Sequence, residues 1–321
     1  MAEILEDFLV ATPSGYYCRY GNFFLDPLMP VEYAVISHAH GDHARPGHLH
    51  IFATPGTSAF MQHRFPRQPM GSYQRKDYHE PFEINGVEIQ FIPAGHMLGS
   101  AQIWMRYRNC TYLYTGDIKL QEDATCEPIE LVPADVLITE TTFANPEIQH
   151  PDPVAEIKKL NSTSHNIMLG CYALGKSQRI TNLINEHCPE KTVYVHHNML
   201  PLHRIYDRIG SCPLHYQIYQ RKVLNDGKNK IYLVPPMTFN NYIRAKNVLR
   251  AFASGWQRLH RHNDLEVYIS DHVDWADLLA IIEKVKPQEI WTVHGDGNHL
   301  ARFLNGKTIV KNINSNPHSN N

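Results

Sequence analysis

Paired cysteines, long apolar runs and an excess of basic charge are all missing from this sequence. The 6 cysteines never form a CxxC pair, which argues against a zinc ribbon, and a disulfide framework is unusual in a chain of 321 residues. No run approaches the roughly 20 apolar residues that cross a bilayer, and acids stand in the N-terminal stretch where a signal peptide carries basic residues. We therefore expect a protein of the reducing cytoplasm with no membrane partner.

The overall charge is close to balanced. Lysine and arginine number 30 and the acidic residues 32, for a net charge of −2, so no global field attracts a polyanion. Local basic pairs such as Arg64 and Arg67 are typical of solvated faces. Charge alone therefore neither predicts nor excludes a nucleic-acid partner.

Histidine is abundant, with 21 copies, and its placement is uneven. The segment Ser37–His43 reads SHAHGDH and follows the apolar stretch Tyr33–Ile36, which predicts a strand. Three imidazoles and one carboxylate within six residues are costly to crowd together unless a cation binds them. Both groups are ligands of the kind that zinc prefers.

The spacing inside this segment predicts two ions. In extended backbone His38 and His40 point to the same side and can chelate one ion. Gly41 permits a sharp turn, which would present Asp42 and His43 to a second ion.

Three further candidate ligands stand where predicted strands end. His96 lies in a glycine-flanked loop, Asp117 follows in TGD after a strand, and His294 ends another strand in VHGD. Each alone is a weak signal, because histidine and aspartate are common in turns. Together with the first segment they predict a metal centre in which Asp117 bridges two ions.

Short apolar runs between turn residues predict strands in the first 140 residues. They are Asn22–Asp26, Tyr33–Ser37, His50–Ala53, Val87–Pro93, Ala101–Tyr107, Thr111–Thr115 and Val136–Thr139. Asn85-Gly86 predicts a two-residue hairpin turn before Val87.

From about residue 150, strands alternate with helical stretches, which predicts a parallel α/β unit. The predicted strands are Asn166–Gly170, Val193–Val195, Tyr232–Val234, Val267–Ile269 and Ile290–Val293. The predicted helices in the middle of the chain are Lys176–Glu186, Leu200–Ile209 and Asn240–Ala251. We expect an α/β unit built by both ends of the chain, another inserted within it, and a frayed polar tail from about Lys311.

These features, in their order along the chain, resemble the motif series of the metallo-β-lactamase superfamily: HAHGDH at His38–His43, the single His96, and TGD ending at Asp117. Further motifs resemble those of its β-CASP nucleases. They are ETTFA at Glu140–Ala144, ISDHVD at Ile269–Asp274, VHG at Val293–Gly295 and ALGKSQ at Ala173–Gln178. The resemblance extends from about Phe8 to Leu304.

The opening stretch is most similar to the bacterial ligase-associated DNA exonucleases, which are Artemis-like and mRNA-processing-like β-CASP proteins. The segments that carry this similarity are Thr12–Tyr17, Asp26-Pro27 and His43–His48. The resemblance implies a DNA exonuclease of DNA repair that acts on nucleic acid, DNA rather than RNA, with a DNA ligase and a helicase as partners.

For the fold, the resemblance implies an α/β protein, a metallo-β-lactamase αββα sandwich with an inserted α/β β-CASP domain. The sandwich would comprise residues 1–145 and 265–310, and the insert residues 146–264. Residues 311–321 would form the polar tail.

For the site, the resemblance implies two divalent ions, zinc in preference to manganese. One ligand set would be His38, His40, His96 and Asp117, and the other Asp42, His43, Asp117 and His294. Asp26 would orient ligands without binding an ion itself.

The resemblance also assigns catalytic roles to Asp42, Glu140 and His272. Two ions can activate a water for attack on a phosphodiester. His272 would protonate the leaving oxygen, with Glu140 accepting its other N–H. Lys176 and Ser177, at a predicted helix start, would bind a flanking phosphate through free backbone N–H groups.

Three other functions stay open. A histidine at the third β-CASP motif, here His294, resembles the RNA-processing members and favours a ribonuclease. A thioester or lactam hydrolase would need the metal ligands but neither Glu140 nor His272. A degenerate, inactive subunit would be expected to lose ligand types, and every expected type is present.

Overall fold

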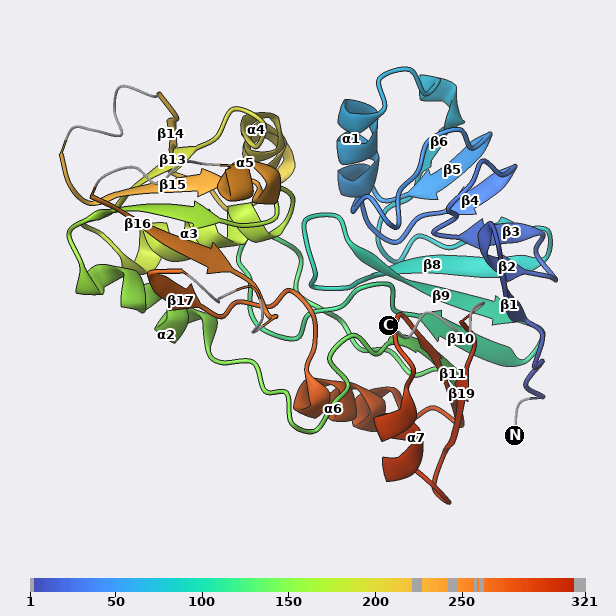
Figure 1. The fold of residues 1–321 in the computed structure, drawn as a ribbon. Coiled ribbons are helices and arrows are strands. Elements are labelled where there is room, and N and C mark those ends of the chain that lie inside the picture. Colours follow the sequence, from blue (N-terminus) through green and yellow to red (C-terminus); the bar gives the residue numbers. More distant parts are fainter. Residues whose placement is uncertain (1–2, 221–226, 242–246, 257–258, 260–262, 315–321) are drawn as a thin grey trace. The chain divides into compact units, whose positions relative to one another are not determined.

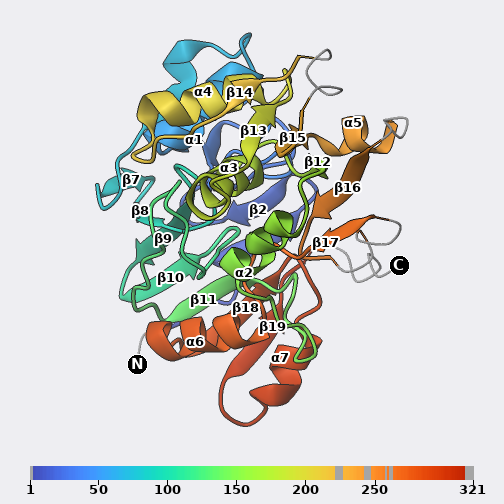
Figure 2. The same cartoon turned by 90° about the vertical axis from the view of Figure 1, so that its left-hand side faces the viewer.

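The computed structural model describes residues 3–220, 227–241, 247–256, 259 and 263–314. The chain folds into two compact units (Figures 1 and 2). The first unit comprises Met1–Glu122, Glu127–Gln149 and His272–Asn321, and the second comprises Asp123–Cys126 and His150–Asp271. Both ends of the sequence therefore build the first unit.

The first unit contains two sheets. One has six strands in the order β1 to β6, antiparallel from β1 to β3 and parallel from β3 to β6. These strands are β1 (Leu9–Thr12), β2 (Gly15–Cys18), β3 (Phe23–Leu25), β4 (Tyr33–Val35), β5 (His50–Ala53) and β6 (Tyr73–Arg75).

The other sheet has seven strands in the order β19-β18-β11-β10-β9-β8-β7. They are β7 (Phe82–Ile84), β8 (Val87–Pro93), β9 (Ala101–Tyr107), β10 (Cys110–Tyr114), β11 (Val136–Glu140), β18 (Glu289–Val293) and β19 (Ile309–Asn312). Strands β7 to β10 are antiparallel, whereas β10, β11, β18 and β19 are parallel to one another.

The main core of the first unit lies between these two sheets. Apolar side chains from both sheets meet there, such as Leu25 and Val35 of the first sheet and Ile103 and Tyr112 of the second. Alternation along β8 produces this face, because successive side chains of a strand point to opposite sides.

Helices cover the outer faces of both sheets (Figure 1). Met61 of helix α1 (Pro55–Arg64) packs with Ala34 and Ile51 of the first sheet. Helices α6 (Trp275–Val285) and α7 (Asn298–Phe303) cover the second sheet. Their packed residues include Leu278, Ile281 and Leu300 against Leu113, Leu137 and Ile290. The predicted αββα sandwich is therefore confirmed.

The second unit is built on a six-stranded, fully parallel sheet in the order β14-β13-β15-β12-β16-β17. Its strands are β12 (Asn166–Gly170), β13 (Thr192–Val195), β14 (Gln217–Ile218), β15 (Lys230–Val234), β16 (Val248–Ala253) and β17 (Leu265–Val267). Its helices are α2 (Pro153–Lys158), α3 (Lys176–His187), α4 (Leu200–Ile209) and α5 (Pro236–Asn241). Short 3₁₀ turns occur at Met70–Ser72 in the first unit and Lys159–Ser162 in the second.

Most predicted elements occur as expected, and the predicted hairpin is present between β7 and β8. Its turn residues Asn85 and Gly86 have φ of 48° and 86°, the positive values that a two-residue hairpin turn needs.

Two predictions were wrong. The expected helix Asn240–Ala251 is replaced at its end by β16, which pairs with β12 and β17, while residues 242–246 lie outside the described residues. Lys311 and Asn312, which were expected to open a frayed tail, instead belong to β19 and pair in parallel with β18. Both errors concern strands whose stability comes from a distant partner strand. Residues 315–321 of that tail lie outside the described residues.

The limits predicted for the inserted domain, residues 146–264, stay a prediction. In the part of the chain that the structure describes, no helix is both long and apolar enough to pass through a bilayer.

Candidate metal centre

The candidate ligands stand on loops that follow strand ends of the first unit. β4 leads to the loop with His38, β8 to that with His96, β10 to that with Asp117, and β18 to His294. Strands β10, β11 and β18 are parallel, so their carboxyl ends meet at one edge of the sheet. The loop after β4 joins this edge, because the Ala101 N–H at the start of β9 donates to the Ser37 carbonyl.

The loop from Ser37 to His43 closes in a tight turn. The N–H groups of His43 and Ala44 both donate to the His40 carbonyl, at 3.2 and 2.8 Å. His38 and His43 are buried and His40 is half-buried, so the turn directs the imidazoles inward.

Four side chains form the first group. His38, His40, His96 and Asp117 each offer one ligand atom, and these atoms lie within 4.8 Å of one another. Nδ1 of His40 is 3.1 Å from Nε2 of His38 and 3.0 Å from Nε2 of His96. Asp117 Oδ2 is 3.5 Å from Nε2 of His38 and 3.8 Å from Nε2 of His96.

This spacing fits a divalent ion. A tetrahedral zinc ion with its usual bond lengths separates its ligand atoms by about 3.3–3.4 Å. The spacings within the first group lie on both sides of that value. The donor set, three imidazoles and a carboxylate, also has the chemistry that zinc prefers.

A second group shares Asp117 with the first. His43, Asp117 and His294 offer ligand atoms within 4.8 Å of one another, and His43 Nε2 is 3.4 Å from Asp117 Oδ1. Asp42 lies at the edge of this group, with Oδ2 at 3.9 Å from His43 Nε2 and a side chain that is 75% exposed. The two oxygens of Asp117 thus face different groups of histidines.

The charges at this centre are strongly coupled. Burial, with the neighbouring His43, holds the pKa of His38 well below its usual value, so its imidazole is neutral as a metal ligand must be. Burial also acts to lower the pKa of His43, but Asp117 and Asp26 outweigh it and raise the pKa to about 10. An ion bound by His43 would have to displace this proton, because metal and proton compete for the imidazole nitrogen. Burial acts to raise the pKa of Asp117, yet the imidazoles around it, His43 foremost, hold it well below its usual range.

Asp26 lies behind the ligands and is saturated with hydrogen bonds. It accepts from the N–H and hydroxyl of Ser37, from the Tyr114 hydroxyl, and pairs with Nδ1 of His43 at 2.8 Å. This leaves Nε2 of His43 to face Asp117. These contacts are those expected of a carboxylate that orients a ligand.

Glu140 and His272 form a hydrogen-bonded pair beside the first group. Nδ1 of His272 is 3.0 and 2.8 Å from the two Glu140 oxygens. Glu140 is itself fixed, because it accepts from the Ile118 N–H and the Thr142 hydroxyl. Glu140 is buried, whereas the His272 side chain is 26% exposed and can reach a substrate.

Glu140 and His272 also form, with Asp117, a third group whose atoms lie within 4.8 Å. We favour the hydrogen-bonded pair over a third ion, because Asp117 Oδ2 already faces His38 and His96. His272 Nδ1 is 3.9 Å from that oxygen, much farther than from Glu140.

Three supporting residues were not predicted from the sequence. Ser37 and Tyr114 donate to Asp26, and the ammonium of buried Lys119 donates to the His96 carbonyl at 3.1 Å. The only sequence signal is adjacency: Ser37 precedes HAHGDH, and Tyr114 and Lys119 flank TGD.

Lys176 and Ser177, the predicted phosphate ligands, are buried in the second unit. The Lys176 ammonium donates to the Ile269 carbonyl at 2.8 Å and lies 3.4 Å from Asp271. The Ser177 hydroxyl donates to the Ala173 carbonyl. The backbone N–H groups, through which the phosphate was predicted to bind, donate to the carbonyls of Leu174 and Tyr172. These contacts do not support the predicted role, which stays a prediction.

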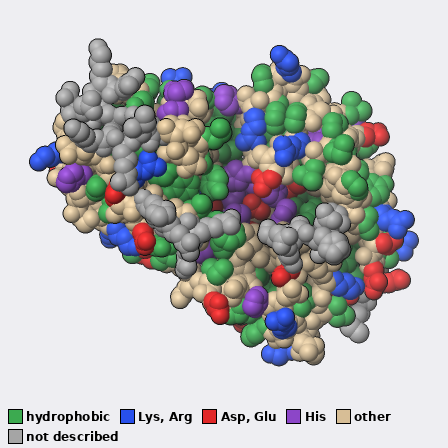
Figure 3. All heavy atoms as spheres, viewed as in Figure 1, with side chains coloured by type: hydrophobic (Ala, Val, Ile, Leu, Met, Phe, Trp, Pro, Cys, Tyr) green, Lys and Arg blue, Asp and Glu red, His purple; other side chains and the backbone are tan. Residues whose placement is uncertain are grey.

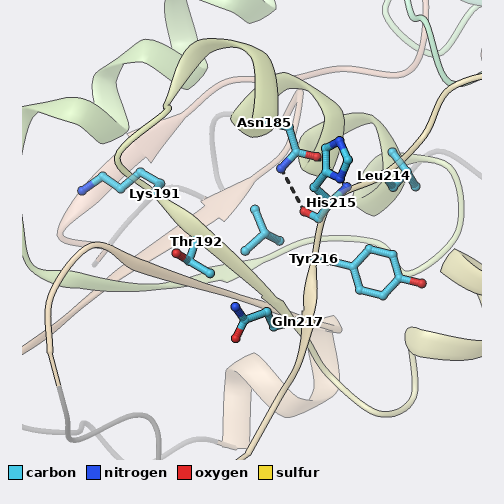
Figure 4. A pocket seen from close by; sticks show the side chains of 8 residues that line it. Asn185, Lys191, Thr192, Leu214, His215, Tyr216 and Gln217 are labelled. Carbon is cyan, nitrogen blue, oxygen red and sulfur yellow. Dashed lines mark hydrogen bonds between the residues drawn. The ribbon is translucent and has the colours of Figure 1, made fainter.

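The second unit also has a pocket of about 350 Å³ (Figure 4). Its lining is mostly polar and includes Asn185, Thr192, His215 and Gln217. Asn185 makes hydrogen bonds with both the N–H and the carbonyl of His215. These bonds hold the loop before β14 against α3, so we assign the pocket no chemistry.

Histidine and acidic side chains gather at one place on the surface seen in Figure 3, with basic side chains beside them. A reactive group must meet its substrate at such a surface, and His272 and His294 are both accessible.

Two family models match the chain. Residues 20–197 match the beta-lactamase superfamily domain, and residues 266–305 match the Zn-dependent metallo-hydrolase RNA specificity domain.

Similar proteins include nucleic-acid enzymes. The chain is 28% identical over 307 residues to a probable DNA ligase of Opitutus terrae, covering 90% of this chain and 29% of that protein. It is 26% identical over 184 residues to Endoribonuclease YSH1 of Eremothecium gossypii, covering 54% of this chain and 24% of that protein. The chain thus spans less than a third of the length of these curated relatives.

A solved structure has a similar fold. It is a crystal structure of a protein of unknown function from Enterococcus faecalis V583, with a TM-score of 0.60 and 15% identity. The match covers 96% of this chain and 84% of that chain.

Proposed function

The chain belongs to the beta-lactamase superfamily, and on this premise we propose that it is a metal-dependent nuclease of the β-CASP type. One observation carries the proposal. The pair formed by Glu140 and His272 lies beside a histidine cluster that shares Asp117 with a second group. Water activation and leaving-group protonation can therefore occur at one place.

We propose two divalent ions, zinc in preference to manganese. The first would be held by the group described above. The second would be held by His43, Asp117, His294 and Asp42, whose Oδ2 lies 3.9 Å from Nε2 of His43. Bound there, the ions would lower the pKa of a water and neutralise charge that develops on the phosphate.

Glu140 and His272 would carry out the proton transfer to the leaving group. Glu140 accepts the Nδ1–H of His272, so Nε2 is the atom that can carry a transferable proton. A water that has released a proton to solvent attacks phosphorus. The P–O bond to the leaving sugar oxygen then breaks, and that oxygen takes the bond's electron pair. His272 gives it the Nε2 proton, and the carboxylate of Glu140 stabilises the imidazolium before transfer.

Asp26 completes the arrangement from behind. It fixes the ring of His43 so that Nε2 faces Asp117.

A lactam or thioester hydrolase has no use for the Glu140–His272 pair, which is why we propose phosphodiester cleavage.

For the substrate we propose DNA, and for the action an exonuclease of DNA repair. The similarity to the ligase of Opitutus terrae extends over 90% of this chain, against 54% for the endoribonuclease. A DNA ligase is accordingly the partner class that we propose, in the cytoplasm. A helicase partner stays a prediction.

An RNA substrate is the second candidate. The match of residues 266–305 to an RNA specificity domain and the similarity to Endoribonuclease YSH1 both favour it.

The decisive test is cleavage of matched single-stranded DNA and RNA oligonucleotides, each labelled separately at either end, with zinc or manganese. We expect metal-dependent shortening of DNA, and the two labels distinguish exonuclease from endonuclease action and give the polarity. The Asp42→Ala and His272→Ala variants are the controls. Cleavage of RNA alone would replace DNA by the second candidate, and no cleavage of either would refute the nuclease proposal.

A further inference from the structure

Two arginines stand beside the loop that carries the candidate ligands. Arg45 follows His43 by two residues, and Arg64 is the last residue of helix α1. A Cβ on Gly41 would lie 4.0 Å from Nη1 of Arg64, so this guanidinium reaches the turn itself. Both arginines are exposed, and we call them the rim arginines.

Helix α1 fixes where Arg64 lies. At its start, the hydroxyls of Thr54 and Thr57 both donate to the Gly99 carbonyl, in the loop that follows His96. The helix has 10 residues and therefore extends about 15 Å from this loop. Its last turn thus delivers Arg64 to the other ligand-bearing loop, at Gly41.

Charged groups of both signs surround Arg64. Although Arg64 is exposed as a residue, partial burial of its guanidinium lowers its pKa, the carboxylate of Asp42 raises it and the second guanidinium, Arg45, lowers it again. Arg64 therefore has one carboxylate and one further cation in its surroundings. The proposed function assigns the Asp42 carboxylate to an ion, which would weaken its attraction to Arg64.

A phosphate would neutralise the positive charge of the rim arginines. A guanidinium presents a planar fork of N–H donors that matches two oxygens of a phosphate. In a nucleic-acid strand the phosphate next to the scissile one is always present, whatever the bases. Basic side chains also border the histidine and acidic side chains on the surface in Figure 3.

We infer that Arg45 and Arg64 bind a backbone phosphate of the nucleic-acid strand adjacent to the phosphate that is cleaved. The inference rests on the proposed function and names two binding residues for it. Because phosphate contacts carry no base information, these contacts make binding independent of sequence and sensitive to salt.

The test measures binding, apart from turnover. In a zinc-loaded His272→Ala background, fluorescence anisotropy follows a labelled single-stranded oligonucleotide at several salt concentrations. The added variants are Arg45→Gln and Arg64→Gln, singly and together. Each should raise Kd roughly three- to tenfold and reduce the slope of log K against log salt by about 0.7, the value for one phosphate contact on a single strand.

Arg106→Gln is the matched control. It removes the same charge from an exposed arginine of the first unit, which pairs with Glu88. Arg106 lies five residues along β9 from Ala101, the residue that contacts the ligand loop, so its loss should leave the slope unchanged. The replacements Arg45→Lys and Arg64→Lys keep the charge and should restore the slope.

The outcomes separate the two proposals. If the background protein binds no nucleic acid, the proposed function fails. If it binds, and the rim variants match Arg106→Gln in slope, the inference is overturned, because the rim arginines then make no contact with the phosphates of the strand. A change of melting temperature without a change of slope would lead to the same conclusion.

Discussion

At the scale of single residues, the histidines of this protein divide by what surrounds their rings. Nδ1 of His40 lies 3.1 Å from Nε2 of His38 and 3.0 Å from Nε2 of His96, so nitrogens of three rings converge on one point. Such convergent lone pairs are what a cation stabilises. His272 instead places Nδ1 2.8 Å from a carboxylate oxygen of Glu140, a partner suited to a ring N–H.

This difference separates metal binding from proton transfer. The variant His40→Ala removes a convergent nitrogen, so we expect it to lose both bound metal and activity. His272→Ala should keep its metal and lose roughly 10²–10⁴-fold in kcat, the usual contribution of general acid catalysis. Metal content by mass spectrometry and kcat on the preferred oligonucleotide check this.

The exposed His63 on α1 supplies the control, since His63→Ala should change neither quantity. Full activity in His272→Ala would remove the general acid from the mechanism.

His203 shows a structural role for a buried histidine. It lies fully buried in the second unit, against Gln178 and Thr181 of α3. Burial lowers its pKa to about 4. The folded state therefore favours the neutral ring more strongly than the unfolded state does.

The lowered pKa of His203 determines how the free energy of unfolding changes with pH. A folded pKa below the unfolded value of about 6.5 gives stability that is present above that pH and is lost as the pH falls toward 4. Between pH 7 and pH 5 the loss due to this group is about 2 kcal/mol. Urea unfolding of the wild type and of His203→Gln at both pH values should show the difference; equal pH dependence in both would contradict it.

At the scale of elements, the site depends on one close approach between a helix and a loop. Gly99, with φ of 81°, packs so tightly on α1 that a Cβ there would lie 2.6 Å from the Thr57 N atom and 2.7 Å from the Gly56 Cα. The same loop carries His96. Packing of α1 and the position of a ligand are therefore linked.

We predict that Gly99→Ala weakens both the packing of α1 and the binding of metal by His96. Backbone strain at positive φ, with the clash against α1, should cost about 1–3 kcal/mol of unfolding free energy, and displacement of His96 should lower zinc affinity. Gly71→Ala is the control, since a Cβ at Gly71 meets nothing within 4 Å. Denaturant melts and zinc titrations measure the two effects. Unchanged zinc affinity in Gly99→Ala would show that the loop position does not depend on α1.

At the scale of the whole molecule, the candidate ligands come from distant parts of the chain. His38 and His294 are brought into the same unit although the second unit is inserted between them in sequence. An ion bound by such residues links segments that are independent in the unfolded chain. Binding free energy therefore adds to folding stability.

Removal of the metal by a chelator should reveal its contribution to folding stability. Removing metal with EDTA should lower the Tm, because an ion at 1,000 times its Kd contributes about 4 kcal/mol. The variant His40→Ala should show a smaller shift or none. Calorimetry with and without EDTA measures it, and an identical Tm for the wild type under both conditions would argue that no tightly held ion contributes to folding.

The sequence predicted much of this molecule, for reasons that are local. SHAHGDH is dense enough in ligand types to indicate a cation, and β5, β8 and β9 have the bounds predicted from apolar runs between turn residues. The turn at Asn85-Gly86 was likewise predictable, since few residues tolerate positive φ at two successive positions.

The errors of the sequence analysis concern elements that depend on partners distant in the chain. β16 and β19 exist because neighbouring strands supply their hydrogen bonds. The burial of the Lys176 side chain beside Asp271 likewise follows from the packing of the second unit.

The sequence by itself determined the chemistry of this protein: the ligand types, their spacing in one loop and the strands that present them. The sequence predicted that Asp117 would be shared and that Asp26 would orient a ligand. Only the tertiary structure identified His43 as the residue that Asp26 pairs with, and brought Arg64 to the turn at Gly41. The physical reason is that residue type and local backbone preference are encoded within a few residues. Which side chains converge is set instead by the packing of strands and helices far apart in the chain.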